Sequence, residues 1–356
     1  MYRSVISAAA LTMLVASSVS AQDAPPSSPE QAPPPEPVVI APSAQAFTLL
    51  PASTPQLARK RRPGMVGYID DSTVTTQLRF RFDAGFGNNV PDRAEFFYAK
   101  CGCYQIDPAP FGDPDAPGPG LGVPTELNFQ QFYAHVEYGR PDRMSLFAEL
   151  PFRAIQPQGF EDFGPDYPPF PDFSGLGDIR AGAKLSLMSD ENTDVTLMVR
   201  AGLPTGDASK GLSTDTFNIE PALLFQRHVT DRFGIEGQIG TWHPFGGSRA
   251  HDNDDDKFSG NILFYGIGPS FDLVNTDRIR FTPIAELVGW RVFGGSQTAC
   301  PGAVCTYDAD DNIVNLKLGA RTTVNNRNSI YVGYGWALTE AQWYDKIWRI
   351  EYRVGF

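Results

Sequence analysis

Four cysteines are the residues of this chain with the clearest capacity for covalent chemistry, because a pair of them can form a disulfide. Cys101 and Cys103 lie in one predicted loop, and Cys300 and Cys305 in another. An exported chain meets an oxidising compartment, where disulfides are the expected state. Cys300 with Cys305 is a local pairing, Cys101 with Cys103 would close an unusually tight ring, and cross-pairing between the loops stays open. A zinc site is disfavoured because tandem C-x2-C spacing and a neighbouring histidine are both missing.

Two acidic runs, 251–256 and 308–311, are candidate cation sites. Carboxylate oxygens suit Ca²⁺ or Mg²⁺, either directly or as bridges to lipopolysaccharide phosphates. The candidate ligands are Asp252, Asp254, Asp256, Asp308 and Asp310. Lys257 stands where an EF-hand loop needs glycine, which favours the alternative of a solvated acidic surface. The sequence therefore predicts no resident metal and no other cofactor.

Catalytic motifs are missing from the sequence. It contains no G-x-S-x-G, H-E-x-x-H, Walker A or dinucleotide-binding glycine pattern. None of the four histidines precedes a serine by two positions on the apolar side of a strand, as in the outer-membrane phospholipase. We therefore expect no enzyme.

Composition narrows the class further. The formal net charge of -12 argues against a nucleic-acid partner, which needs a concentrated basic surface. The 34 glycines and 31 prolines among 356 residues are too many for a helical bundle and indicate many turns.

The N-terminal region divides into two parts. Residues 1–21 have the short basic start, apolar stretch and small residues of a secretory signal peptide. Residues 22–66 are rich in proline and are predicted to be an extended or disordered periplasmic linker. Residues 67–356 form the remaining domain.

That domain alternates apolar and polar residues with a period of two. In 77–84 one side carries Leu, Phe, Phe and Ala, and the other carries Gln, Arg, Arg and Asp. Each segment has about ten or more residues, the length of a tilted strand that crosses a bilayer. We predict twelve strands, at 75–86, 129–140, 143–155, 176–189, 194–204, 217–229, 232–243, 261–274, 278–293, 313–325, 328–338 and 346–356.

Short and long connections alternate along these strands, which is typical of an all-β, transmembrane, antiparallel up-and-down barrel. Twelve is an even number, so both ends of the barrel domain are expected on the periplasmic side of the outer membrane of a Gram-negative-type bacterium. The chain stops at Phe356 on an alternating strand, which resembles the signal read by the outer-membrane assembly machinery. Lipid and lipopolysaccharide are the other expected partners of the barrel.

If the apolar side faces lipid, the polar side lines the lumen. This set contains both signs of charge, and we expect opposite charges on neighbouring strands to pair. A lined solute channel and a lumen closed by its own salt bridges both stay open. The predicted lining residues are Arg79, Arg81, Asp83, His135, Glu137, Glu149, Arg153, Asp178, Arg180, Lys184, Arg200, Glu220, Glu236, Asp272, Arg280, Glu286, Lys317, Arg321, Arg349, Glu351 and Arg353.

Residues 175–275 carry a family resemblance. The stretch Gly175-Leu176-Gly177-Asp178, followed by Leu203-Pro204-Thr205-Gly206-Asp207, resembles the outer-membrane barrels of the MetA-pathway phenol-degradation family. The resemblance implies a channel-like barrel that passes small apolar or aromatic compounds. The same motif also has a simpler physical interpretation, in which proline and glycine end a strand and start an outer loop.

Two functions follow from these observations. The first is passive passage of small solutes through a narrow, charge-lined lumen. The alternative is a structural or surface-interaction barrel with a plugged lumen and acidic, disulfide-tied loops.

Overall fold

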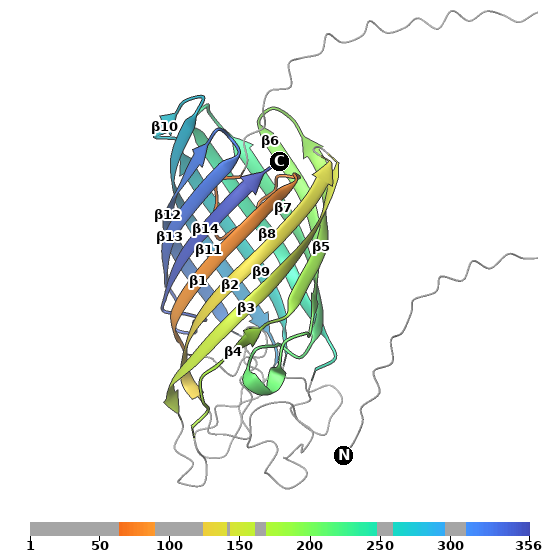
Figure 1. The fold of residues 1–356 in the computed structure, drawn as a ribbon, viewed down its shortest axis with the longest axis vertical. Coiled ribbons are helices and arrows are strands. Elements are labelled where there is room, and N and C mark those ends of the chain that lie inside the picture. Colours follow the sequence, from red (N-terminus) through yellow and green to blue (C-terminus); the bar gives the residue numbers. More distant parts are fainter. Residues whose placement is uncertain (1–63, 90–123, 141–142, 161–168, 248–258, 296–310) are drawn as a thin grey trace, which may run out of the picture. The chain divides into compact units, whose positions relative to one another are not determined.

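Tilted β-strands form the wall of this protein, as seen in the computed structural model of Figure 1. The structure describes residues 64–89, 124–140, 143–160, 169–247, 259–295 and 311–356. In β14 (Lys346–Gly355), Ile350 is 51% exposed, while its neighbours Arg349 and Glu351 are buried. A period of two places alternate side chains on opposite faces of a strand, so each strand has one apolar and one polar face.

The other long strands follow one another along the chain. They are β1 (Gln77–Asn88), β2 (Pro124–Arg140), β3 (Met144–Phe160), β5 (Ile179–Ser189), β6 (Thr193–Leu203), β7 (Phe217–His228), β8 (Phe233–Phe245), β9 (Asn261–Phe271), β11 (Ile279–Phe293), β12 (Asn312–Val324) and β13 (Asn328–Ala337). Each overlaps one predicted strand. β2 and β3 extend further than predicted, because they continue to pair through irregular register near Pro124.

The sheet closes on itself, because β1 pairs antiparallel with both β2 and β14. Of the fourteen strands in the described part of the chain, twelve form this closed wall. The short β4 (Phe173–Leu176) pairs only with β3, and β10 (Val274–Asn275) pairs only with β11. The predicted twelve-strand antiparallel barrel is therefore confirmed.

The two ends of the barrel differ. The turn end carries the short connections, such as 325–327, where Asn325 and Asn326 have φ of 53° and 51°, suited to a tight hairpin. The C-terminus and β10 lie at this end in Figure 1. The loop end carries the long connections, together with β4 and the one-turn helix η1 (Ala208–Lys210). Within the described ranges, no helix has the length and apolar character needed to cross a membrane.

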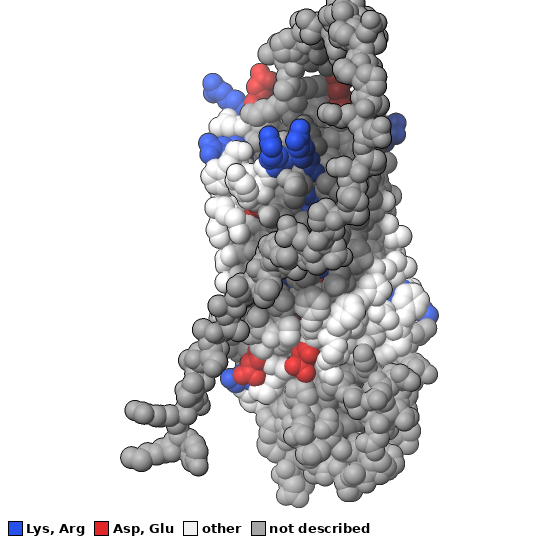
Figure 2. All heavy atoms as spheres, turned by 90° about the vertical axis from the view of Figure 1, so that its right-hand side faces the viewer, with Lys and Arg blue, Asp and Glu red and all other residues white. Residues whose placement is uncertain are grey.

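The outer face of the wall is apolar. Large side chains point outward from many strands, including Leu146 on β3 at 57% exposed and Trp348 on β14 at 51% exposed. On the face drawn in Figure 2, uncharged residues make up most of the described wall. An exposed apolar area of this extent marks a surface that is normally covered.

The interior of the barrel holds a segment that precedes β1. Residues 64–76, here called the lumen loop, contain the buried residues Met65, Val66 and Ile69. The predicted boundary between the linker and the barrel domain falls within this segment, after Val66, and both parts lie against the inner wall. Met65 and Ser72 contact wall residues near the turn end, and the residues between them reach Glu286, midway along β11. The loop thus enters from the turn end, turns near Tyr68 and leads back to β1. All described residues belong to one compact unit, Leu57–Phe356, and none of them belongs to the other unit, Met1–Gln56.

Candidate functional site

A single carboxylate of the wall accepts hydrogen bonds from the tip of the lumen loop. Glu286 on β11 accepts from the backbone N–H groups of Tyr68 and Ile69 at 2.9 Å each, and from that of Gly67 at 3.2 Å. The hydroxyl of Tyr331 donates to the same carboxylate at 3.1 Å. Neighbouring lumen positions act in the same way, since Glu236 and Gln238 accept from Met65 N and Asp70 N.

Three buried arginines donate to the backbone carbonyls of the loop. Arg321 on β12 reaches the carbonyls of Met65 and Val66 at 2.8 Å each. Arg349 on β14 donates to Gly67 O at 2.6 Å. Arg353, further along β14, donates to Val66 O at 3.0 Å and forms an ion pair of 3.0 Å with Asp71.

These contacts explain how a segment without a strand partner can be buried. Buried backbone N–H and C=O groups need partners, and here charged lumen side chains supply them. A hydrogen bond to a charged group contributes about 1.5 to 3 kcal/mol, and leaving a buried group unpaired costs a similar amount. The charged lumen of the sequence analysis therefore holds a segment of the same chain.

The ring of Tyr68 fixes the tip of the lumen loop. Two cationic groups lie over it, with Lys317 Nζ 3.9 Å and Arg349 Cζ 4.0 Å from its centroid. Gly67 lies directly on the ring of Tyr331, because a Cβ at Gly67 would come within 2.2 Å of that ring. Cation–π contacts in a desolvated site contribute about 2 kcal/mol each, so these two contacts stabilise the tip.

A second charged cluster joins neighbouring strands of the wall. Glu137 on β2 accepts from Lys184 Nζ at 3.1 Å, and Arg79 on β1 pairs with Glu149 on β3 at 3.2 Å. His135 Nδ1 lies 3.2 Å from Arg79 Nη2 and 3.6 Å from Glu149 Oε2. All five side chains are buried, and they link four adjacent strands.

Two further ion-pair groups lie at mid-depth. Asp83 binds Arg349 through two hydrogen bonds of 2.6 and 2.7 Å, and Arg81 Nε lies 3.4 Å from the same carboxylate. Arg200 on β6 pairs with Glu220 at 2.5 Å.

Arg200 also pairs with Asp70 of the lumen loop, at 3.2 Å. Nearer the turn end, Glu351 accepts from Arg321 at 2.8 Å and from Arg353 at 2.5 Å. These pairs connect the wall and the loop into one network.

The remaining predicted lining residues fall into three groups. Arg153, Arg280 and Asp272 are buried, with Arg280 against the sulfur of Met65 and Asp272 bonded to Thr282. Asp178 bonds to the outer connection that follows β6. Arg180 points into a cavity described below.

The two recognised motifs contact each other. Asp178 of G-L-G-D accepts from Gly206 N at 3.1 Å and from Thr214 N at 2.8 Å. Thr205 of L-P-T-G-D donates to Gly177 O at 3.1 Å. Asp207 caps η1, and hydrogen bonds from Lys210 and Ser209 lower its pKa below the ordinary value. The motif pair thus builds one outer connection, in agreement with its physical interpretation.

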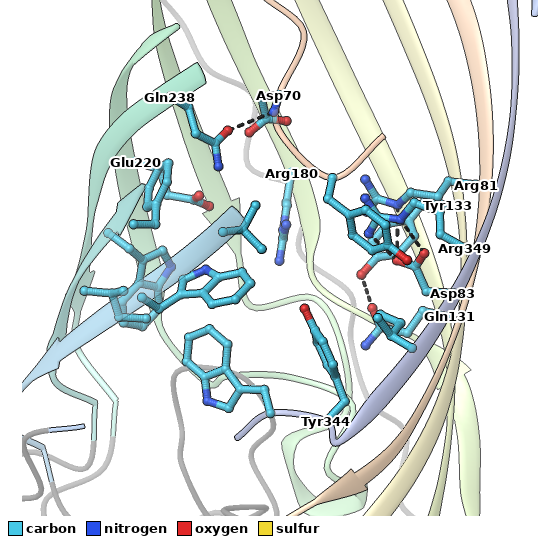
Figure 3. Close-up of a pocket in the computed structure, with 18 of the residues that line it drawn as sticks. Asp70, Arg81, Asp83, Gln131, Tyr133, Arg180, Glu220, Gln238, Tyr344 and Arg349 are labelled. Carbon is cyan, nitrogen blue, oxygen red and sulfur yellow. Dashed lines mark hydrogen bonds and ion pairs between the residues drawn. The ribbon is translucent and has the colours of Figure 1, made fainter. Parts of the chain in front are cut away.

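A cavity of about 190 Å³ lies on the loop-end side of Tyr68. Tyr68 and Asp70 of the lumen loop form its floor. An aromatic group that includes Trp242, Trp290 and Phe264 forms one side, and Figure 3 shows Arg81, Asp83 and Arg349 together on another.

The connection 338–345 completes this cavity. Trp343 and Tyr344 turn inward and are buried, with Trp343 packed on Trp290 at 5.0 Å and Tyr344 on Phe129 at 6.2 Å between ring centroids. From the sequence, this connection is predicted only as a short outer loop. The aromatic pair between two strands is the signal that could have identified it.

Several predicted sites lie outside the described residues. They are the four cysteines, Cys101, Cys103, Cys300 and Cys305, and the acidic residues Asp252, Asp254, Asp256, Asp308 and Asp310. Across the ranges that the structure does describe, no group of three or more His, Cys, Asp and Glu side chains is arranged to hold a metal ion.

Comparison with known proteins gives structural likeness without close sequence similarity. No protein-family model matches the chain, and no curated protein sequence is similar to it. An outer membrane channel from Pseudomonas putida F1 is 16% identical, with 80% of this chain and 96% of that chain covered and a TM-score of 0.49. The KdgM porin is 9% identical, with coverages of 79% and 99% and a TM-score of 0.38. The β domain of the Bordetella autotransporter BrkA is 10% identical, with coverages of 79% and 100% and a TM-score of 0.44. Because each TM-score lies below 0.5, no functional inference for this chain rests on these likenesses.

Proposed function

We propose that this chain is an outer-membrane channel for passive passage of small solutes, and that the lumen loop closes it in the state described here. The observation that carries the proposal is the attachment of the loop. Polar contacts with wall side chains hold it, beside apolar contacts of Met65, Val66 and Ile69 with Ile284 and Val288. The loop end above it contains a cavity, bordered by an apolar cluster that includes Phe129 and Trp242. Water can replace the hydrogen bonds that the segment gives up, and its apolar contact with the wall is confined to a few side chains, so the segment can leave and return.

The membrane location rests on the outer face of the barrel. Exposed Leu, Ile, Val and aromatic side chains cover the wall, as expected where lipid surrounds a barrel with a polar interior. Export through the signal peptide and recognition of Phe356 by the assembly machinery are part of the same proposal. Phe356 is exposed beside the turn end, where its backbone N–H donates to Thr76 O.

The solute class is a finer part of the proposal. The family resemblance of residues 175–275 supports small apolar or aromatic compounds. The cavity has three indole rings among its lining residues, which favours flat solutes.

Single-channel recording in planar bilayers tests the channel. The intact chain is expected to conduct poorly, and a variant that lacks residues 64–74 is expected to conduct well while it retains its folded, heat-modifiable migration on gels. A folded deletion variant that stays closed under all voltages would refute the channel.

The second candidate is a structural or surface-interaction barrel with a permanently plugged lumen. The specific observation in its favour is the continuous ion-pair network that joins the wall to the lumen loop. A folded deletion variant without conductance, together with surface binding that depends on the outer loops, would support it.

A further inference from the structure

Two residues that line the cavity above the lumen loop carry buried polar atoms with no hydrogen-bond partner among the described residues. Gln131 on β2 is only 3% exposed, and its Nε2 has no hydrogen-bond partner, while its Oε1 accepts from Tyr133. The buried hydroxyl of Tyr68 also has no partner. An unpartnered buried polar atom costs about 1 to 3 kcal/mol, so a ligand that accepts from both would be stabilised.

The charged side chains that line the cavity include one more cation than anions. Arg81, Arg180, Arg200 and Arg349 line it with the three carboxylates of Asp70, Asp83 and Glu220. Asp83 pairs with Arg349 and Arg81, and Arg200 pairs with both Asp70 and Glu220. Glu149, the cross-strand neighbour of Arg180, interacts with it electrostatically but makes its ion pairs with Arg79 and Arg81. Among the described residues, no hydrogen bond or ion pair joins the guanidinium of Arg180 to another side chain, and Figure 3 shows this side chain extending into the open space.

The other part of the lining is flat and apolar. Trp242, Trp290, Trp343, Phe264 and Ile262 contribute to it. Aromatic side chains of this kind bind a planar ring by offset stacking or edge contacts. The cavity volume of about 190 Å³ exceeds the roughly 150 Å³ that holds one benzene in an engineered apolar cavity, so it accommodates one ring and a small polar group.

We infer that this cavity is a binding site for a small aromatic carboxylate. The carboxylate takes Arg180 as its counter-ion and accepts from Gln131 Nε2, and the ring lies against the indole group. This inference rests on the proposed function, since it places a solute site on the path that the lumen loop closes. Among the described lining residues the cations exceed the anions by one, which matches a monoanion, and the aromatic wall distinguishes the ligand from a simple inorganic anion.

Calorimetric titration of the purified, detergent-solubilised chain tests the site with three probes. Benzoate carries both features, acetate only the carboxylate, and benzyl alcohol only the ring. Benzoate is expected to bind at one site per chain, with acetate and benzyl alcohol each roughly tenfold weaker or more. Benzoate binding that is absent, or no tighter than acetate binding, would overturn the inference.

Two variants locate the site. Arg180→Gln is expected to weaken benzoate roughly tenfold and to leave benzyl alcohol unchanged, because only the charge is lost. Gln131→Glu is expected to weaken benzoate as well, since it adds a carboxylate beside the ligand without changing the side-chain size. Arg227→Gln, at an exposed arginine outside the cavity, is the matched control and should bind like the unaltered chain. Equal weakening in Arg227→Gln and Arg180→Gln would contradict the assignment, and unweakened binding in both cavity variants would do the same.

The two proposals fail separately. Calorimetry needs no ion current, so benzoate binding to a barrel that never conducts would support the binding site and refute the channel. If the loop-deleted barrel conducts but the intact chain binds no benzoate, the channel is supported and the binding site is refuted.

Discussion

The carboxylate of Glu286 accepts a hydrogen bond of 2.9 Å from the backbone N–H of Tyr68, across 218 positions of the sequence. Glu286 belongs to the barrel wall and Tyr68 to the tip of the lumen loop. This contact therefore joins the part of the chain that forms the lumen to the part that fills it. It also defines where the closed state is most easily weakened.

Replacement of Glu286 by glutamine is expected to release the tip of the lumen loop. The amide keeps one acceptor oxygen, but it loses the charge and faces backbone N–H groups with its own N–H₂. A loss of about 2 kcal/mol shifts the closed-to-open ratio roughly thirtyfold, which should appear as more frequent open events in single-channel recordings.

The control for this change is Glu137→Gln. Glu137 is also a buried carboxylate, and it accepts from Gln77, Ser145 and Lys184 of the wall. Its replacement should lower barrel stability without raising the open fraction. Equal opening in the two variants would contradict a specific role for Glu286.

A side chain at Gly67 is expected to displace the loop tip, because its Cβ would come within 2.2 Å of the Tyr331 ring. Gly67→Val should raise conductance. A second change, Tyr331→Ala, removes the obstructing ring and should lower the conductance of the double variant again. If Gly67→Val conducts no better than the unaltered chain, close packing at this position does not hold the loop.

A charge on the outer face is expected to destabilise the barrel in a lipid bilayer. Ile350→Lys, at an exposed position in the middle of β14, should cost roughly 2 to 4 kcal/mol of unfolding free energy in urea titrations with lipid vesicles. Leu338→Lys, just beyond the end of β13, should cost roughly 0 to 1 kcal/mol. Similar costs at the two positions would argue against a lipid-facing wall.

Loss of the Asp178 carboxylate is expected to loosen the outer connection after β6 without unfolding the barrel. In Asp178→Asn one of the two carboxylate oxygens becomes an amide nitrogen, which cannot accept a hydrogen bond. The contact with either Gly206 N or Thr214 is therefore lost. Hydrogen exchange of residues 204–216 should accelerate roughly tenfold, while exchange in the wall strands stays unchanged. Unaltered exchange in this connection would remove the role assigned to the motif pair.

The strands of the wall could be predicted from the sequence, because the alternation that separates the two faces of a strand lies within that strand. In β14, Trp348, Ile350 and Tyr352 alternate with Arg349, Glu351 and Arg353, and this pattern needs no knowledge of any other strand. The short turns, such as Asn325-Asn326, could be recognised in the same way. The inward arginines and carboxylates could be named from these patterns, but not their partners.

The lumen loop could not be predicted, because it has no periodicity and no strand partner. Gly67 and Tyr68 separate Val66 from Ile69, two acidic residues follow, and Met65 and Val66 fall within the predicted linker. Their contacts with Glu236, Arg321 and Glu286 span 171 to 256 positions and exist only after the barrel has closed. The cavity is equally non-local, since it forms between this loop, the inward-turned Trp343 and strands from all sides of the barrel.

The sequence by itself therefore determined the twelve-strand wall, its apolar outer face and its charged inner face, because these depend on alternation within single strands. The tertiary structure decided what occupies the lumen. Side chains of both signs can neutralise one another, bind a solute or bind backbone, and only their positions around the closed barrel show that many of them bind the chain's own lumen loop. Arg180 is an inward arginine that faces the cavity and makes no hydrogen bond or ion pair with the described residues, and that distinction is a property of distances that no local pattern encodes.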